Sequence, residues 1–472
     1  MLRRPSPPLR VLSGWLALGI ALSLQASARA QTPAPAAEPP PVVSLRVQQR
    51  ARYDVIDNSP RLDTRSSDQA LELQTSLFVE AGRGSVRFNG ELFDARTELN
   101  GAQSFLSTNH VNTLEPLQVN VSWNFSALLR SGYAGSLKVG RFTTDVGKRR
   151  LVSRSNTRNT ITSYTGAEWR WRAPDGRNAL VFWGVPMRNL PSDKPSLLDN
   201  ERELDLGNRG TSLRGAYYQF APIRKRDWFE VYWFGLDQPN RPSNDALPRH
   251  FDSLGFRSFR PNAPGKWSYE VEAVKQHGTS SATVGSITRR DLVHDAEFYH
   301  WEFGYTFASK LVPVVLLQYD RASGDKDPFD GRNGTFDTLF GERRFDFVPQ
   351  GLYSLFARSN LRTPGVRLTF NSTPRLQSMF SYRSYSLDAP RDAWSGVGYR
   401  DVTGHAGSFV GRQLEGSFTW RAIPGRLTFE SGFAQLTAGR FMRETAGAAF
   451  RGNPVFVYTM LTTSFGRRYG AR

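Results

Sequence analysis

The chain of 472 residues contains no cysteine, which excludes disulfide bonds and thiolate metal sites. Histidine is also scarce. The six histidines are scattered, with no HExxH motif and no paired spacing, so no metal site is predicted. Serine and histidine form no recognisable catalytic constellation either. We therefore expect no catalytic residues, no cofactor and no enzymatic activity.

Long apolar runs are missing from the chain, with one exception near the N-terminus. Residues 11–24 (VLSGWLALGIALSL) follow three arginines and precede a small A-x-A site at residues 28–30. This run of about 14 residues is shorter than the ~20 that a helix needs to cross a bilayer. We therefore predict a cleaved secretory signal peptide at residues 1–30 rather than a membrane anchor. Residues 31–41 (QTPAPAAEPPP) are expected to form a flexible periplasmic leader.

Acidic residues are too few to balance the basic ones. The chain has 61 lysines and arginines against 43 aspartates and glutamates, a formal net charge of +18. The predicted signal peptide carries four arginines and no acid, which leaves +14 on the mature chain. Such an excess predicts an acidic ligand, anionic lipopolysaccharide at the cell surface, or both. Nucleic acid is discounted as a partner, because the basic charge is distributed over many segments of a secreted chain.

What the chain has in abundance is an alternation of apolar and polar residues. In residues 45–55 (LRVQQRARYDV) and 167–172 (AEWRWR), nearly every second side chain is apolar. A period of two predicts β-strands with one apolar face and one polar face. The mean hydropathy of −0.46 fits strands of which half the residues face water. Behind a signal peptide, this pattern is typical of an outer-membrane β-barrel.

Alternation and turn residues together predict about 18 strands. Their approximate spans are 42–57, 69–81, 84–97, 116–128, 134–142, 161–173, 178–186, 209–221, 227–237, 248–260, 266–278, 295–308, 311–322, 363–371, 375–386, 411–422, 426–438 and 454–465. Short Gly/Pro/Asn/Asp turns alternate with long polar segments at 98–115, 143–160, 187–208, 279–294, 323–362, 387–410 and 439–453.

Short periplasmic turns and long extracellular loops are typical of transmembrane antiparallel up-and-down β-barrels. We therefore predict an all-β chain, with the barrel at residues 42–465 and a C-terminal extension at 466–472. The last predicted strand ends at the aromatic Phe465, as strands recognised by the barrel-assembly machinery commonly do.

Side-chain parity within each strand separates the lipid face from the lumen. It places a series of arginines in or near the lumen, and the long segment at 143–160 adds more. These candidates for substrate binding are Arg46, Arg50, Arg52, Arg149, Arg150, Arg158, Arg170, Arg172, Arg214, Arg367 and Arg383, and Arg141 is added because of the family resemblance given below. Guanidinium groups bind carboxylates bidentately. Glutamates are about as frequent at lumen parity, so ion pairs that brace the wall remain an alternative, as does binding of lipopolysaccharide phosphates by the loop arginines.

One stretch of the chain is rich in acidic residues. Asp320, Asp325, Asp327, Asp330 and Asn333 fall within YDRASGDKDPFDGRNG. Oxygen ligands at this density can hold Ca²⁺. The spacing is not that of an EF-hand, however, and basic residues are interspersed. A solvated loop without metal is the favoured interpretation.

Several segments, taken in order, resemble the alginate-export family of outer-membrane porins. They are LKVGR at 137–141, GKRRLVSRS at 147–155, YTGAEWRWR at 164–172, YDRASGD at 319–325, FDTLFG at 336–341 and VGRQLE at 410–415. The resemblance implies an 18-stranded monomeric channel in the outer membrane of a Gram-negative bacterium. It also implies that a lumen rich in arginine and lysine passes an acidic polysaccharide.

We therefore expect a diffusion channel for uronate-type saccharides or other anionic, sugar-like solutes. A general or anion-preferring porin is the main alternative. A third possibility is a surface-binding barrel plugged by residues 323–362, a segment long enough to fill such a lumen.

Overall fold

The computed structural model describes residues 42–62, 64–155, 157–208, 210–239, 247–342, 351–447 and 450–469. The predicted signal peptide and leader lie outside the described residues. Within these ranges, no helix is long and apolar enough to cross a membrane.

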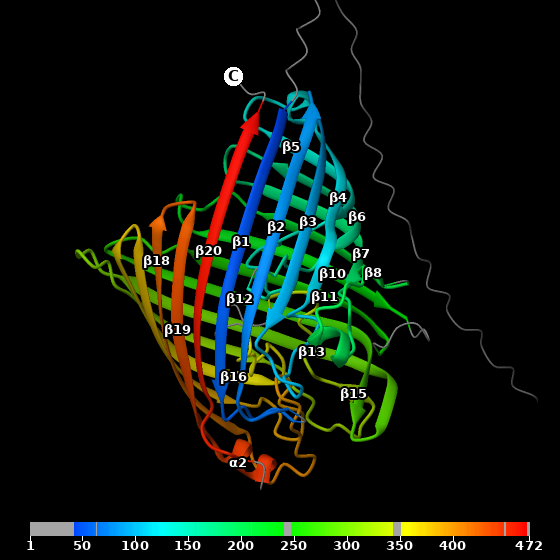
Figure 1. The fold of residues 1–472 in the computed structure, drawn as a ribbon, viewed down its shortest axis with the longest axis vertical. Helices are drawn as coiled ribbons and strands as arrows, with labels where there is room; N and C mark the ends of the chain where they lie inside the picture. Colours follow the sequence, from blue (N-terminus) through cyan, green and yellow to red (C-terminus); the bar gives the residue numbers. More distant parts are fainter. Residues whose placement is uncertain are drawn as a thin grey trace, which may run out of the picture. The chain divides into compact units, whose positions relative to one another are not determined.

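The described chain forms a closed antiparallel β-barrel of 18 strands (Figure 1). The ring closes because β1 pairs with β2 on one side and with β20 on the other. The first strands are β1 (Val42–Asp57), β2 (Asp68–Arg83), β3 (Val86–Glu98), β4 (Asn112–Asn124), β5 (Ala134–Phe142), β6 (Tyr164–Arg172), β7 (Asn178–Arg188), β9 (Ser212–Gln219) and β10 (Trp228–Gln238). The others are β11 (Arg249–Arg260), β12 (Lys266–Val284), β13 (Ile287–Thr306), β14 (Val314–Ala322), β16 (Leu361–Thr373), β17 (Leu376–Ser386), β18 (Phe409–Ile423), β19 (Leu427–Ala438) and β20 (Val455–Tyr469). The number of strands and their order confirm the prediction.

A few short elements lie between the barrel strands. They are the two-residue strands β8 (Leu206–Gly207) and β15 (Arg332–Asn333), the helices α1 (Lys194–Leu198) and α2 (Arg440–Ala446), and a 3₁₀ turn at Ser126–Leu128. Strand β15 pairs in parallel with the end of the β12–β13 hairpin, at Val293 and His294.

The two ends of the barrel differ in the length of their connections. The strand register sets Val43 opposite Tyr469, so both ends of the barrel chain lie at the end with the short turns (Figure 1). Short turns face the periplasm in barrels of this type, so the long loops face outward from the cell.

Several predicted boundaries are wrong, and β4, predicted at 116–128, lies four residues earlier at Asn112–Asn124. Residues 279–294 are not a loop but extend the β12–β13 hairpin, which turns at Gly285 and Ser286 and pairs Thr283 with Thr288. Alternating Ser, Thr and Val suit a pleated ladder, and the φ of +59° at Gly285 suits a two-residue turn. Strand β20 also runs to Tyr469, because β1 supplies it with partners beyond Phe465.

The outer face of the barrel is apolar and aromatic, including near its short-turn end. Trp301 and Phe303 on β13 are 59% and 51% exposed, and the ring of Trp267 on β12 stacks 5.0 Å from that of Phe303. Large apolar side chains with this exposure require a lipid environment.

Two large buried apolar clusters lie inside the barrel, and a small third one joins Phe93 and Leu117 to Ile161. One large cluster joins the inner faces of β7, β9 and β10, through Phe182, Leu213 and Phe234, to Val146 and Leu151 of the β5–β6 loop. The other large cluster joins loop residues, including Leu352 and Trp394, to the inner faces of β1, β17 and β18–β20. The loops therefore pack into the barrel, and parts of its inner wall are apolar because they contact these loops.

Candidate pore constriction

The β5–β6 loop, residues 143–163, crosses the lumen and is called the strap here. Asn159 holds one end of it. Its amide donates to the backbone carbonyls of Leu73, Arg96 and His110 at 3.3, 3.1 and 2.7 Å, and Gln74 on β2 donates to its carbonyl oxygen at 2.8 Å. Asn159 is 1% exposed. The strap is thereby fixed to β2 and β3.

Arg150 is the second anchor of the strap. Its Nη1 atom donates to Oε1 of Glu270 at 2.6 Å and also binds Glu272, both on β12. Strands β2 and β12 lie nine steps apart in either direction around the ring of 18 strands. The two anchors of the strap are therefore on opposite walls, and the strap divides the lumen.

The β14–β16 connection, residues 323–360, is called the long loop, and described parts of it also enter the lumen. The backbone N–H of Phe340 donates to Leu151 of the strap at 3.0 Å, and that of Glu342 donates to Arg149 at 2.9 Å. Val152 and Phe340 form a short parallel bridge. Strap and long loop thus join into one structure inside the barrel.

The long loop is itself fixed to the wall at several points. Gln276 on β12 exchanges two hydrogen bonds with the backbone of Asp337, at 2.8 and 2.9 Å. Further along, the N–H of Leu352 donates to Asp54 on β1 at 2.9 Å, and the hydroxyl of Tyr353 donates to Gln413 on β18 at 2.7 Å. The constriction is therefore formed by two loops whose positions the barrel wall determines.

Four of the predicted lumen arginines lie on the inner wall or in the strap and already bind carboxylates. Their side chains cannot leave the lumen without breaking these pairs, several of which are buried. The four pairs are Arg52–Asp54 (2.7 Å), Arg150–Glu270 (2.6 Å), Arg170–Glu168 (2.7 Å) and Arg383–Asp320 (3.1 Å).

A fifth, Arg141, also binds carboxylates, since it contacts both Asp205 (3.0 Å) and Glu115. It lies on the outward-facing parity of β5, however, opposite Val119 and Thr165, so its prediction as a lumen residue is wrong.

The remaining lumen candidates differ in accessibility. Arg46 and Arg172 are exposed on the inward-facing parity of β1 and β6. The guanidinium of Arg46 lies 5.8 Å from the ring of Phe78. Arg367 is half-buried on the inner face of β16.

Arg50 connects the wall to the strap, because it donates to the carbonyl of Arg158 at 2.6 Å. Arg158 in turn donates to Asn109 at 2.6 Å and to Thr162 at 2.8 Å. Arg149 lies in the strap with a φ of +67°. Arg50 and Arg158 therefore join the wall, the strap and the β3–β4 loop, and the backbone carbonyl of Arg149 accepts the N–H of Glu342 from the long loop.

The prediction for Arg214 is wrong. Arg214 is exposed on the outward-facing parity of β9, where the register sets it opposite Trp183, which is 49% exposed. Its neighbours Leu213 and Tyr217 are buried and face inward. Because the strap packs against this wall, the apolar residues of β9 face the interior and the charged residue faces outward.

Sequence parity missed other members of the constriction. Arg257 on β11 is 6% exposed and donates to both carboxylate oxygens of Glu230 at 3.0 Å and to Glu270 at 3.0 Å. Its strand carries Phe251 and Phe259 on the inner face and Phe256 on the outer face. Without a contrast in polarity between the faces, alternation could not assign Arg257 to the lumen.

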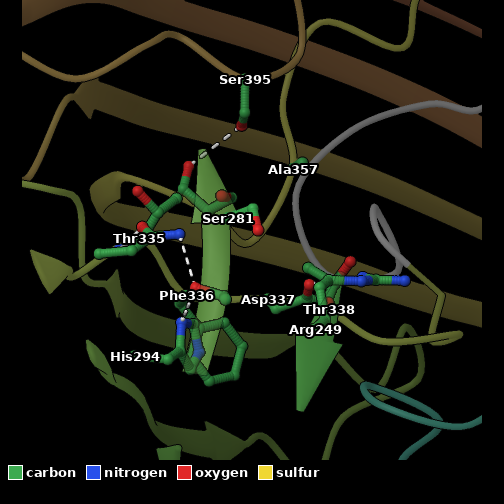
Figure 2. A pocket seen from close by; sticks show the side chains of 12 residues that line it. Arg249, Ser281, His294, Thr335, Phe336, Asp337, Thr338, Ala357 and Ser395 are labelled. Atoms are coloured by element: carbon green, nitrogen blue, oxygen red, sulfur yellow. Dashed lines mark hydrogen bonds and ion pairs between the residues drawn. The ribbon is translucent and has the colours of Figure 1, made fainter. Parts of the chain in front are cut away.

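A cavity of about 240 Å³ lies between the wall and the long loop (Figure 2). Serine and threonine hydroxyls dominate its lining, together with one cation, Arg249, which donates to Asp337 at 2.6 Å. Although burial opposes it, Arg249 keeps the pKa of Asp337 below its ordinary value. His294 lines the cavity and contacts Ser280 at 3.1 Å, and Ser281 has a buried hydroxyl oxygen without a partner among the described residues. The cavity suits a ligand with many hydroxyl groups.

The acidic stretch after β14 does not gather into one group. Asp320 faces inward and binds His300 at 2.6 Å, whereas Asp325, Asp327 and Asp330 line a separate outer cavity. Asn333 is engaged with Ser280 at 3.0 Å. No group of acids or histidines in the described residues is positioned to hold a metal ion.

The basic excess of the chain concentrates at the periplasmic end. The eight short turns, with the strand residue on each side, form the turn-side rim, which holds only two acids, Asp175 and Asp227. Its twelve cations are Arg83, Arg130, Arg172, Arg177, Arg224, Lys225, Arg226, Arg260, Lys266, Lys310, Arg375 and Arg426. In the sequence of the long loops, by contrast, basic and acidic residues nearly balance.

The closed barrel, its lipid-exposed belt and its inward-folded loops define an outer-membrane channel of the porin class. The model of the family described as "Alginate export" matches residues 42–456, so the chain belongs to the alginate-export family. No curated protein sequence matches the chain.

Solved structures of similar fold come from Pseudomonas aeruginosa. Its opdK barrel has a TM-score of 0.57 at 12% identity and covers 90% of this chain and 99% of its own. OccD3 (OpdP) has a TM-score of 0.56 at 12% identity and covers 90% and 91%. OprD has a TM-score of 0.54 at 12% identity and covers 90% and 94%.

Proposed function

We propose that this channel passes anionic, hydroxyl-rich solutes, of which acidic saccharides of the uronate type are the first candidate. The observation that carries the proposal is the exposure of Arg46 and Arg172 on the inner wall, with Arg170 next to Arg172 on β6, its side chain 27% exposed. Guanidinium groups bind carboxylates more specifically than ammonium groups do.

The pairing of the wall arginines supports passage rather than tight binding. A solute carboxylate that binds Arg170 takes the place of Glu168, so the arginine remains paired before, during and after passage. Conduction requires several weak sites of this kind rather than one strong site. The hydroxyl-lined cavity beside Arg249 would add hydrogen bonds to sugar hydroxyls.

The barrel closes within one chain, and we propose that it functions as a monomer. Lipopolysaccharide around its outer rim and the barrel-assembly machinery are the partners that this location implies. A general anion-preferring porin remains the alternative without a saccharide role.

A second candidate function is a barrel closed at rest by its loops. The hydrogen bonds between strap and long loop, at Leu151 and Arg149, favour it, because they join two loops that lie inside the barrel.

The test is single-channel conductance of the mature protein in a planar bilayer, with oligogalacturonate added. Anion-selective conductance that the oligouronate blocks, but maltohexaose of equal length does not, supports the proposal. Replacing Arg170 and Arg172 by Gln should weaken the block. Conductance indifferent to both sugars favours the general porin, and no conductance favours the closed barrel.

A further inference from the structure

The cavity of Figure 2 lies at the end of the barrel with the long loops and is called the loop-side cavity here. The wall contributes Arg249 at the start of β11, Ser280 and Ser281 on β12, and His294 on β13. The long loop and the β17–β18 loop, with Ser395, line the other side. Because Ser395 is exposed, the cavity reaches solvent beside it.

The irregular pairing of β12 with β13 gives the cavity two adjacent serines. The register passes from Ser280, opposite Leu292, to Ala282, opposite Arg289. In a regular strand, consecutive side chains point to opposite faces. The irregularity lets both Ser280 and Ser281 line one cavity, where the hydroxyl oxygen of Ser281 is buried and has no hydrogen-bond partner among the described residues. Because an unsatisfied buried hydroxyl is unfavourable, a ligand hydroxyl gains by binding there.

The hydrogen bonds around His294 define a neutral imidazole. Both hydrogen bonds between the side chain of Gln276 and the backbone of Asp337 leave Oε1 of Gln276 as an acceptor, so Nε2 of His294, at 3.2 Å from that oxygen, carries the proton. Asn333 donates to Ser280 at 3.0 Å, and the Ser280 hydroxyl donates its own proton to Nδ1 of His294 at 3.1 Å. A ring nitrogen that accepts a hydrogen bond carries no proton. His294 therefore adds no charge to the cavity.

The remaining charges of the cavity cancel. Arg249 donates to Oδ2 of Asp337 at 2.6 Å and to Gln238 at 2.7 Å, and Oδ1 of Asp337 accepts the N–H of Leu339 at 2.7 Å. Among the described lining residues, this pair holds the only ionised groups, so their formal charges sum to zero. A ligand carboxylate would have to compete with Asp337 for Arg249, whereas a neutral ligand leaves the pair intact.

The volume of the cavity, about 240 Å³, limits the size of its ligand. Apolar cavities of about 150 Å³ admit benzene. The loop-side cavity therefore has room for a six-membered sugar ring with its hydroxyl groups.

We propose that the loop-side cavity binds one uncharged pyranose unit from the outer side of the membrane. The inference goes beyond the proposed function, because this ligand is neutral and the site is built on β11–β13, away from Arg46 on β1 and Arg172 on β6. Two sources supply such a unit at the cell surface, a free saccharide and the core sugars of lipopolysaccharide.

The experiment measures binding to the mature protein in detergent by saturation-transfer NMR. The probes are the methyl α-glycosides of glucose, mannose and galactose, each compared with the corresponding methyl uronide, which differs only by the carboxylate. At least one neutral glycoside should bind, and its uronide should bind at least about fivefold more weakly, because its charge finds no unpaired cation. Absence of binding by all three neutral glycosides, or a uronide that binds more tightly, would overturn the inference.

Two variants locate the binding. Ser281→Leu fills the cavity and should abolish the signal, whereas Ser286→Leu, at the exposed tip of the same hairpin, is the matched control and should retain it. Asp337→Asn releases Arg249 from its carboxylate and should shift the preference toward the uronide by at least about tenfold. A Ser281→Leu protein that binds like the native one would overturn the inference.

Competition identifies the source of the sugar. If rough lipopolysaccharide displaces the glycoside and lipid A does not, the core sugars are the ligand, and if neither displaces it, the ligand is a free saccharide. Either result supports the site. Block of single channels by oligogalacturonate is measured separately, so failure of the neutral site and failure of the proposed function are distinguishable.

Discussion

Arg150 of the strap and Glu270 of β12 are joined across the lumen by a 2.6 Å contact between Nη1 and Oε1, although 120 residues separate them in the sequence. Both side chains are less than a tenth exposed. This contact fixes the strap to the wall opposite β2.

Arg150→Ala should free that end of the strap and leave Glu270 and Glu272 without one of their cations. Removal of one partner from a buried ion pair costs about 3–5 kcal/mol, and Arg257 still contacts Glu270, so the lower end is expected. Conductance should increase and become noisier. The shift in gel mobility that marks unfolding of the barrel should occur at a lower temperature. Arg290→Ala is the control, and an Arg150→Ala channel identical to it would contradict the role of the strap.

The other anchor of the strap gives a second prediction. Asn159→Asp preserves the shape of the side chain but replaces a donor with acceptors that face three backbone carbonyls. It should therefore disturb the strap more than Asn159→Ala, which only loses the bonds, at about 1 kcal/mol each. Conductance noise and the protease sensitivity of the strap show which of the two Asn159 variants disturbs the strap more. If Asp is tolerated better than Ala, the side-chain amide is not what holds the strap.

The success and the failure of sequence patterns here have the same physical cause. Strands β1 and β2 contact lipid on one face and a polar interior on the other, so alternation identified Arg50 and Arg52. Where the strap packs against β9, apolar residues are required inside, and the same rule placed Arg214 on the wrong face. The pairing of Arg150 with β12 and of Asn159 with β2 depends on contacts far apart in sequence, which no local pattern contains.

Arg172 and Arg214 form a natural comparison, because both are exposed arginines near strand ends but on opposite faces of the wall. Arg172→Glu places an acid in the lumen and should reduce the ratio of anion to cation permeability by about twofold or more. Arg214→Glu should leave that ratio unchanged, because it lies beside Trp183 on the outside. The reversal potential in a salt gradient measures both. An effect of Arg214→Glu equal to that of Arg172→Glu would contradict the assignment of faces.

The packing of the long loop against the β17–β18 loop should depend on pH through Asp325. Burial, and then the carboxylates of Asp392 and Asp330, raise its pKa from 3.8 to about 6. A raised pKa means that the folded loop disfavours the ionised acid, so this penalty is full above pH 6 and absent below about pH 4. Lowering the pH from 8 to 5 should therefore strengthen the packing, including the hydrogen bond from the Asp325 N–H to Asp392.

Hydrogen exchange of residues 323–336, corrected for intrinsic rates, measures this effect. Asp325→Asn should abolish the difference between pH 5 and pH 8, whereas Asp291→Asn, at the exposed hairpin, should retain it. Protection that rises with pH would reverse the sign and exclude Asp325 as its source.

Arg383 tests whether the buried wall pairs are needed for the barrel itself. It is 1% exposed and donates to Asp320 at 3.1 Å, to Gln318 at 2.8 Å and to the backbone and hydroxyl oxygens of Thr363. These hydrogen bonds join β17 to β14 and β16. Arg383→Met removes the guanidinium partner from the buried Asp320, which keeps its contact with His300, and should cost about 3–5 kcal/mol. Arg383→Lys retains the charge but cannot reach three acceptors at once, so it should recover only part of the loss. The temperature of the gel-mobility shift ranks the three proteins. The double variant Arg383→Met with Asp320→Asn should be more stable than Arg383→Met alone, because it also removes the buried negative charge that has lost its guanidinium partner. If Arg383→Lys matches the native protein, the charge alone supports the wall and the planar guanidinium is not required.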